Sequence, residues 1–186
     1  MANSLIEAAG KRERLVESAK ELFHEQGVHT TTLADVASRA EIPVGNVYYY
    51  FKTKDDLVAA VVESRKAEVT AFLAFVDRKR TPQARLKALA QQWVDSADLA
   101  AQYGCPIGSL CSELAKEPDA QPDAPFSTIV DWAQQQLREL GVRDARDQAM
   151  SIVGRIQGAC LLAQSFRDPK IVTREARLID RWIDSL

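Results

Sequence analysis

A run of aromatic and polar side chains before Phe51 offers the chemistry of nucleic-acid recognition. A tyrosine presents a flat ring to a thymine methyl group or a sugar and a hydroxyl to a phosphate, and an asparagine can pair with an adenine edge. A glycine lets the backbone approach a duplex closely. The residues that we expect to be exposed on this segment are Val44, Gly45, Asn46, Tyr48 and Tyr49. The spacing alone fits equally well a helical bundle that carries surface tyrosines.

Three cysteines supply a second kind of chemistry. Cys105 lies between Gly104 and Pro106, just ahead of an expected helix, where a helix amino end can lower the pKa of a thiol. Cys111 and Cys160 lie within apolar helical periods and fit small buried side chains, which also remains possible for Cys105. Their odd number and spacing do not match a zinc site, so we expect free thiols, no metal and no other cofactor.

Large apolar side chains in the same part of the chain offer a pocket for an apolar or aromatic effector. The candidates are Trp93, Tyr103, Ile107, Leu110, Phe126 and Trp132. Each of them fits an ordinary hydrophobic core equally well. The choice between thiol sensing at Cys105 and reversible ligand binding therefore stays open.

The elements that must position these residues are helices. Apolar residues recur at spacings of three and four, as in Leu15, Ala19 and Leu22, and no segment alternates with the period of a strand. This pattern predicts an all-α fold of about nine helices. The expected helices cover residues 11–26, 33–40, 44–50, 54–79, 82–102, 106–116, 126–140, 145–166 and 173–185. We expect the segment 117–125 to be a surface loop.

Two short helices separated by Glu41, Ile42 and Pro43 and preceded by a longer helix predict a helix-turn-helix. Val47 and Phe51, four residues apart, should face inward. At the expected helix starts, Thr31, Thr32 and Lys54 offer hydrogen-bond donors to phosphate.

Composition favours a soluble cytoplasmic protein that is not an enzyme. The chain is 46% hydrophobic and 27% charged with a net charge of −2, so bulk charge gives no sign of nucleic-acid binding. No segment has the roughly 20 apolar residues of a membrane-spanning helix, so we expect no membrane partner. A cysteine nucleophile would need a base, and the two histidines, His24 and His29, lie far from the cysteines in the sequence.

The last two helices predict a homodimer. Helix 145–166 is apolar on two sides, and two of its glycines, four residues apart, would allow close approach of a second helix. The predicted interface residues are Gly154, Gly158, Leu161, Ile179, Trp182 and Ile183. An ordinary buried central helix remains the alternative.

The run TTLADVASRAEIPVGNVYYYFKTKDDL, residues 31–57, closely resembles the signature of the TetR/AcrR family of transcriptional regulators. The resemblance departs from the family at Glu41, where glycine is frequent, and at Pro43, where serine or threonine is frequent. It implies phosphate contacts by Thr32, Tyr50 and Lys54 and major-groove contacts by the exposed residues of the third helix. It also implies a DNA-binding domain over residues 1–54 and a ligand-sensing and dimerisation domain over residues 55–186, with the last two helices pairing across a twofold axis.

The segment that contains Cys105, Gly108, Leu110 and Glu113 resembles the NemR-type branch of electrophile and hypochlorite sensors, in which the sensing cysteine falls at Cys105. We therefore expect a repressor that binds palindromic, double-stranded operator DNA as a homodimer. A small-molecule effector or a cysteine-reactive electrophile or oxidant would release it. The alternative is a helical protein-interaction bundle without DNA binding.

Overall fold

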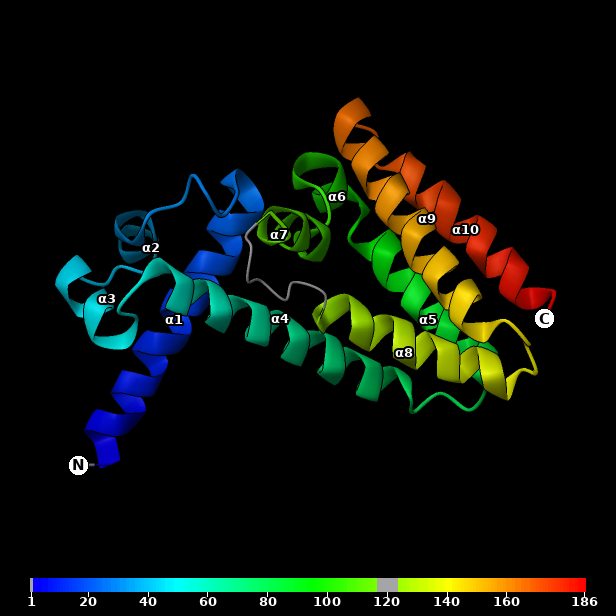
Figure 1. Ribbon diagram of the computed structural model, residues 1–186, viewed down its shortest axis with the longest axis horizontal. Helices are drawn as coiled ribbons and strands as arrows, with labels where there is room; N and C mark the ends of the chain where they lie inside the picture. The colour runs from blue at the N-terminus through cyan, green and yellow to red at the C-terminus, as the bar shows by residue number, and fades with distance from the viewer. Residues whose placement is uncertain (1, 117–123) are drawn as a thin grey trace. The chain divides into compact units, whose positions relative to one another are not determined.

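The structure is a computed structural model that describes residues 2–116 and 124–186, and all regular secondary structure in these ranges is α-helical (Figure 1). The first four helices are α1 (Ala2–Gln26), α2 (Leu33–Arg39), α3 (Val44–Tyr50) and α4 (Lys54–Val76). They are followed by α5 (Pro82–Asp95), α6 (Ala97–Tyr103), α7 (Pro106–Leu114), α8 (Ala124–Glu139), α9 (Ala145–Phe166) and α10 (Lys170–Asp184). The predicted all-α fold is confirmed.

One predicted helix, over residues 82–102, is observed as two. The helix is interrupted at Ser96, whose hydroxyl donates a hydrogen bond of 2.9 Å to the carbonyl of Gln92. A serine that bonds to the preceding turn in this way competes with the regular helical pattern. The described residues therefore form ten helices, whereas the sequence predicted about nine.

The first compact unit comprises Met1–Arg65 and Ser109–Pro122. Its core contains Leu15, Phe23, Val36, Val47 and Phe51, all buried. Residues Leu57 and Val61 of α4 and Leu110 of α7 belong to the same core. This packing carries the first unit past residue 54, where we expected the boundary of the domain. Most of the predicted loop 117–125, namely residues 117–123, lies outside the described residues.

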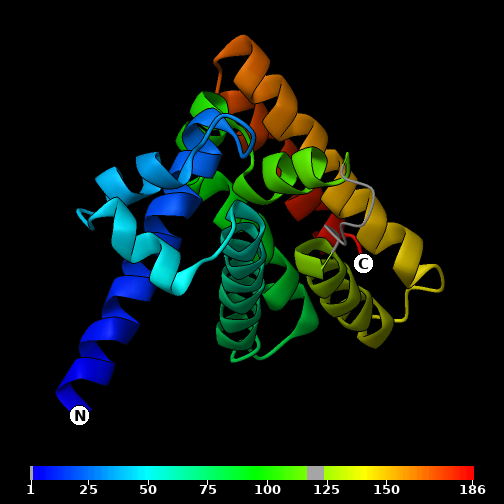
Figure 2. The ribbon, with the colours of Figure 1, turned by 60° about the vertical axis from the view of Figure 1, so that its left-hand side comes forward.

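The second compact unit comprises Lys66–Gly108 and Asp123–Leu186. Helix α9 runs through its core and buries Ile152, Ile156, Ala159 and Ala163. Helices α9 and α10 lie side by side (Figure 2), and their exposed flanks are joined by an ion pair of 2.5 Å between Arg155 and Glu175. The unit therefore has its own hydrophobic centre, built around α9.

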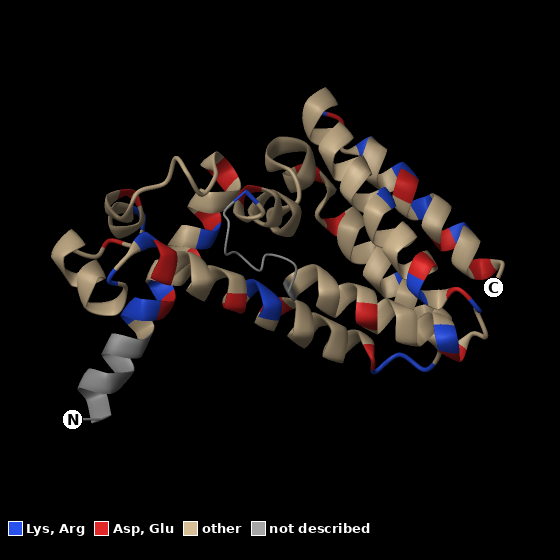
Figure 3. Cartoon of the chain, viewed as in Figure 1, with Lys and Arg blue, Asp and Glu red and all other residues tan. Residues whose placement is uncertain are grey.

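Charged side chains of both signs are interspersed along the helices (Figure 3). Within the described ranges, no helix combines the length and the apolar character that crossing a bilayer requires.

Candidate functional site

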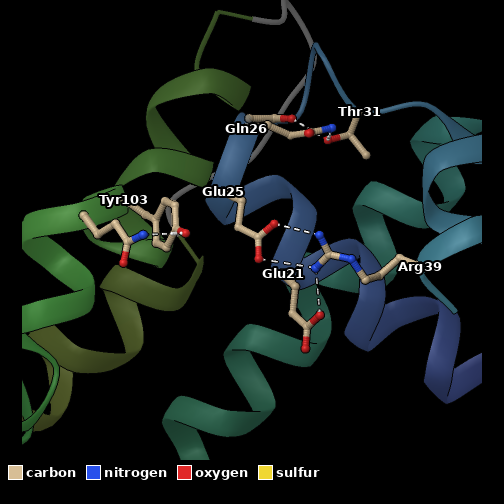
Figure 4. Close-up of polar contacts among 8 residues, drawn as sticks. Glu21, Glu25, Gln26, Thr31, Arg39 and Tyr103 are labelled. Atoms are coloured by element: carbon tan, nitrogen blue, oxygen red, sulfur yellow. Dashed lines mark hydrogen bonds and ion pairs between the residues drawn. The ribbon is translucent and has the colours of Figure 1, made fainter.

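The turn between α1 and α2 is held from inside the first unit. Helix α1 ends at Gln26, and the next residue, Gly27, has a φ of 90°, a conformation that glycine adopts without a steric penalty. The Thr31 side chain is only 1% exposed, and its hydroxyl donates a hydrogen bond of 2.7 Å to the Gly27 carbonyl. The same hydroxyl accepts one from the Gln26 amide at 3.2 Å (Figure 4). The sequence suggested Thr31 as a phosphate donor, but its hydroxyl is committed to the turn and is not at the surface.

A carboxylate from α7 caps the same turn. The Oε2 atom of Glu113 accepts hydrogen bonds from the backbone N–H groups of Val28, at 2.8 Å, and His29, at 3.2 Å. A Cβ atom added to Gly27 would lie 2.9 Å from Oε1 of Glu113, so the close approach also requires glycine there. Sequence reasoning missed this role, because 85 residues separate Glu113 from Val28.

Helix α2 begins with the predicted capping box. The Asp35 N–H donates to the hydroxyl of Thr32 at 3.1 Å, and the Thr32 N–H donates to the Asp35 carboxylate at 2.8 Å. The hydroxyl of Thr32 also donates to that carboxylate, and these bonds lower the pKa of Asp35. This pair fixes where α2 starts and leaves Thr32 at the surface.

The basic side chain at the end of α2 is paired with α1. The guanidinium of Arg39 lies 2.8 Å from a carboxylate oxygen of Glu25 and 3.1 Å from one of Glu21 (Figure 4). Hydrogen bonding by Arg39 lowers the pKa of Glu25, and the two carboxylates raise the pKa of Arg39. The positive charge of Arg39 is therefore balanced within the first unit.

The turn before α3 contains both departures from the family signature. Glu41 has a φ of 53°, in the left-handed region where glycine is favoured, which explains physically why a glycine suits this position. Pro43 occupies the position just before α3 and supplies no side-chain hydrogen bond to the helix. Its carbonyl accepts a hydrogen bond of 2.8 Å from the Asn46 N–H, which closes the first turn of α3.

One side of helix α3 is packed against the core of the first unit, and the other side is exposed to solvent. Val47 is 0% exposed and Phe51 is 2% exposed, and the Arg12 guanidinium lies 5.1 Å from the centre of the Phe51 ring. On the opposite side, Tyr48 is 49% exposed and Tyr49 is 74% exposed. We call the exposed surface formed by Val44, Gly45, Asn46, Tyr48 and Tyr49 the α3 face. All five residues that we expected to be exposed on this helix are exposed.

Two further predicted contact residues flank the α3 face. The partly buried Tyr50 ring meets the Tyr49 ring edge to face at a centroid distance of 5.0 Å. The ammonium group of Lys54 donates a hydrogen bond of 3.2 Å to the carbonyl of His29. Lys54 thus already contributes to the turn that Glu113 caps, and its role toward phosphate remains a prediction.

The second unit brings two of the three cysteines together. The thiols of Cys105 and of Cys160 in α9 interact with one another, and this interaction lowers the pKa of Cys105 and raises that of Cys160. The Cys105 sulfur also accepts bonds of 3.4 Å from the Gly108 N–H and from the side-chain amide of Gln157. We call Cys105, Cys160 and Gln157 the thiol cluster.

These donors determine which thiol ionises first. The hydrogen bond from Cys160 lowers the pKa of Cys105, with further contributions from the Gly108 N–H and Gln157. The same bond and burial raise the pKa of Cys160. Of the two thiols, Cys105 is therefore the one that ionises at lower pH. The sequence indicated Cys105 but gave no sign of its partner.

The six proposed effector-lining residues do not gather in one unit. Trp93, Ile107, Phe126 and Trp132 pack against the core of the second unit, whereas Leu110 is buried in the core of the first. The indole N–H of Trp132 donates to Asp77 at 2.8 Å. The hydroxyl of Tyr103 accepts a bond of 2.7 Å from Gln102 (Figure 4). Leu110 therefore belongs to a different core from the other apolar candidates, and its role in an effector pocket stays a prediction.

The predicted dimer residues divide into two groups. Gly154, Gly158 and Leu161 are exposed on α9, and Trp182 is partly buried. Ile179 and Ile183, each 1% exposed, point into the core of their own unit, so their assignment to an interface is wrong. Several further exposed apolar side chains of α9 and α10 were not among the predicted interface residues. These are Met150, Leu162, Phe166 and Leu178.

A shallow depression of about 460 Å³ lies between α9 and α10. It is lined by Arg155, Gly158, Ala159, Leu162, Ile171, Arg174 and Glu175. We call Met150, Gly154, Gly158, Leu161, Leu162 and Phe166 the α9 stripe. These residues recur at the helical spacing and so share one side of α9.

Comparison with known proteins identifies the first unit. The profile of the family described as bacterial regulatory proteins, tetR family, matches residues 15–61. An uncharacterized HTH-type transcriptional regulator in the lacX 3' region of Lactococcus lactis is 26% identical over 172 residues, covering 87% of each chain.

Solved structures share the fold of both units. A TetR-family regulator from Agrobacterium tumefaciens has a TM-score of 0.83 at 22% identity, covering 94% of this chain and 98% of its own. The reduced form of NemR from E. coli has a TM-score of 0.76 at 20% identity, covering 91% and 95%. These relatives are described as transcriptional regulators. The helix-turn-helix of α2 and α3 lies within the segment that matches the tetR family, and the chain as a whole has the fold of TetR-family transcriptional regulators.

Proposed function

We propose that the chain is a repressor that binds palindromic, double-stranded operator DNA as a homodimer and acts in the cytoplasm. The observation that carries the proposal is the α3 face, where Val44, Tyr48 and Tyr49 are solvent-exposed on a helix anchored by Val47 and Phe51. A rigid short helix with exposed aromatic and amide groups fits the major groove, and Gly45 has no neighbour within 4 Å to block close approach. Asn46 and the tyrosines would make the groove contacts.

Phosphate contacts would surround this face. Thr32 at the start of α2, Tyr50 at the end of α3 and Lys54 at the start of α4 are the candidates, and helix amino ends favour phosphate. Thr31 is left out because its hydroxyl is buried in the turn.

The α9 stripe supports the homodimer. Leu161 is 63% exposed and Phe166 is 70% exposed, and a continuous apolar stripe of this kind is unusual on a monomer. Gly154 and Gly158 have no atom within 4 Å of an added Cβ, so a second helix can approach there. Pairing of two copies would present two α3 faces to the two half-sites of a palindrome.

Release from DNA would be triggered at Cys105. Its sulfur accepts hydrogen bonds from Gly108 and Gln157, which favour the reactive thiolate. An electrophile or oxidant that modified this thiolate would favour the state that does not bind DNA. A reversible small-molecule effector remains the second candidate, supported by the partly buried aromatic residues Trp93, Phe126 and Trp132.

The proposal is tested by selecting bound fragments from genomic DNA and measuring affinity for the recovered sequence. We expect Tyr49→Ala to reduce affinity roughly tenfold, about 1.4 kcal/mol. The matched control is Phe75→Ala, which removes another exposed aromatic ring, 61% exposed on α4, and should leave affinity unchanged. Recovery of no preferred sequence, with weak binding that Tyr49→Ala does not alter, would favour a protein-interaction bundle instead.

A further inference from the structure

The start of α7 approaches α9 unusually closely at the thiol cluster. A Cβ atom added to Gly108 would lie 2.3 Å from the Oε1 atom of Gln157 and 3.3 Å from the Cβ of Cys105. Any larger residue at this position would have to displace the Gln157 side chain. The glycine thus permits the two helices to bring Cys105 against the α9 side chains.

Gln157 and Cys160 meet Cys105 from one side of α9. They are three residues apart, so they share a face of that helix. The Gln157 amide donates a hydrogen bond of 3.4 Å to the sulfur of Cys105, and the neighbouring Cys160 thiol lowers the pKa of Cys105. Cys111, by contrast, is buried in the segment of α7 that belongs to the first unit. Because Gln157 touches the Cys105 sulfur from the same face of α9, the Cys160 thiol lies beside that sulfur, and a disulfide forms once the two sulfurs close to about 2.05 Å.

We propose that Cys105 and Cys160 form a two-thiol modification site that hydrogen peroxide or an organic hydroperoxide converts to an intramolecular disulfide. The inference rests on the proposed sensing role of Cys105 and extends it by naming the resolving thiol. The hydrogen bonds that favour the Cys105 thiolate assign it the attacking role.

The reaction balances in two steps. The thiolate of Cys105 attacks one peroxide oxygen and the O–O bond breaks. This gives a sulfenic acid on Cys105 and an alkoxide or hydroxide, which takes up a proton. The Cys160 sulfur then attacks the sulfenic sulfur, so that the S–S bond forms and the S–O bond breaks. The hydroxide that leaves takes the thiol proton of Cys160 as water. Two electrons pass from the two sulfurs to the peroxide.

The test uses the reduced full-length protein, treated with one equivalent of hydrogen peroxide and then with a thiol-blocking reagent. Intact mass and non-reducing peptide mapping should show the loss of two hydrogen atoms and a cross-link between the peptides of Cys105 and Cys160. Cys111→Ala is the matched control and should form the same cross-link. In Cys160→Ala, whose apolar side chain suits the buried site, a dimedone-reactive sulfenic acid should persist on Cys105.

Gln157→Leu provides a second variant, which leaves both sulfurs in place. It removes one donor to the Cys105 sulfur, so the cross-link should still form but several-fold more slowly. A cross-link to Cys111, or a wild-type protein in which Cys105 is oxidised while Cys160 stays free, would overturn the proposal.

Operator binding measured on the same samples separates the two proposals. A protein that forms the cross-link but binds no DNA sequence in either state supports the two-thiol site and contradicts the proposed repressor. A protein that binds its operator and is released by peroxide without a cross-link to Cys160 contradicts the two-thiol site alone.

Discussion

The carboxylate of Glu113, near the end of α7, accepts a hydrogen bond of 2.8 Å from the backbone N–H of Val28, at the turn that leads into α2. A second bond, from the N–H of His29, reaches the same oxygen. Backbone donors that follow the end of a helix need partners, and a charged acceptor is a strong one. The position of the helix-turn-helix therefore depends on a residue more than 80 positions away in the chain.

We expect Glu113→Ala to lower the free energy of unfolding by about 1–2 kcal/mol, because two backbone donors lose a charged acceptor at a partly solvated site. Thermal or urea unfolding followed by circular dichroism measures the change. Ser112→Ala, at the exposed neighbouring position, is the control and should have little effect. Equal stability of the two variants would show that the Glu113 contacts contribute nothing.

The strained residue in the turn of the helix-turn-helix gives a second prediction. Because Glu41 has a φ of 53°, a glycine at this position should remove a backbone strain of roughly 1–2 kcal/mol. About half of this gain should be offset, because glycine loses more conformational entropy on folding. We expect Glu41→Gly to stabilise the protein by up to about 1 kcal/mol in urea unfolding. Glu41→Ala removes the same carboxylate but keeps the strain, so a gain from alanine as large as that from glycine would exclude this explanation.

The capping box at α2 predicts a loss of stability and a change in pH dependence. Thr32→Ala should cost about 1 kcal/mol, whereas Thr32→Ser, which retains the hydroxyl, should recover most of it. The lowered pKa of Asp35 means that its contribution is present above the ordinary carboxyl pKa and is lost as pH falls through the lowered value. On acidification, the free energy of unfolding of the wild type should therefore fall further than that of Thr32→Ala. Parallel curves for the two proteins would contradict this linkage.

The α9 stripe predicts a concentration-dependent dimer that a single charge disrupts. Leu161→Glu places a carboxylate within the apolar surface, and we expect the dimer dissociation constant to rise at least tenfold, about 1.4 kcal/mol. Sedimentation measures the change, and operator affinity should fall with it. Leu99→Glu, at a 56% exposed position on α6, is the matched control. Dissociation by both substitutions alike would indicate a general effect of the charge.

The thiol cluster predicts a pH profile. Because hydrogen bonds lower the pKa of Cys105, its alkylation by iodoacetamide should rise and level off at lower pH than for a free thiol, whose pKa is about 8.5. Removing a donor raises that pKa, so Cys160→Ala and Gln157→Leu should move the profile to higher pH. Peptide mass spectrometry follows Cys105 in each protein. A profile that neither substitution moves would show that these donors do not control the thiolate.

Local features were predicted well from the sequence. The bounds of α9, the capping of α2 by Thr32 and the anchoring of α3 by Val47 and Phe51 all follow from patterns within a few residues. A helical period shows which apolar side chains share one side of a helix, but it does not show which of two apolar sides packs against the core. For that reason Ile179 and Ile183 were assigned to an interface although they are core residues.

Contacts between distant parts of the chain were not predictable in this way. The partner of Cys105 is 55 positions away, and nothing in the spacing of the three cysteines distinguishes Cys160 from Cys111. Helix packing alone decides the pairing. The one residue in the sequence that reflects this packing is Gly108, because its lack of a side chain leaves room for Gln157 of α9.

The ion pairs of Arg39 bear on how the protein searches a genome. Residues 1–54 carry seven basic and seven acidic residues, and Arg39 is already matched by Glu21 and Glu25. Non-specific attraction to DNA comes from basic groups that displace counterions from phosphate, and each contact steepens the dependence on salt. Because its basic and acidic charges are balanced internally, the first unit should bind only weakly to DNA of unrelated sequence. Its residence on DNA would then depend on the fit of the α3 face to a matching site.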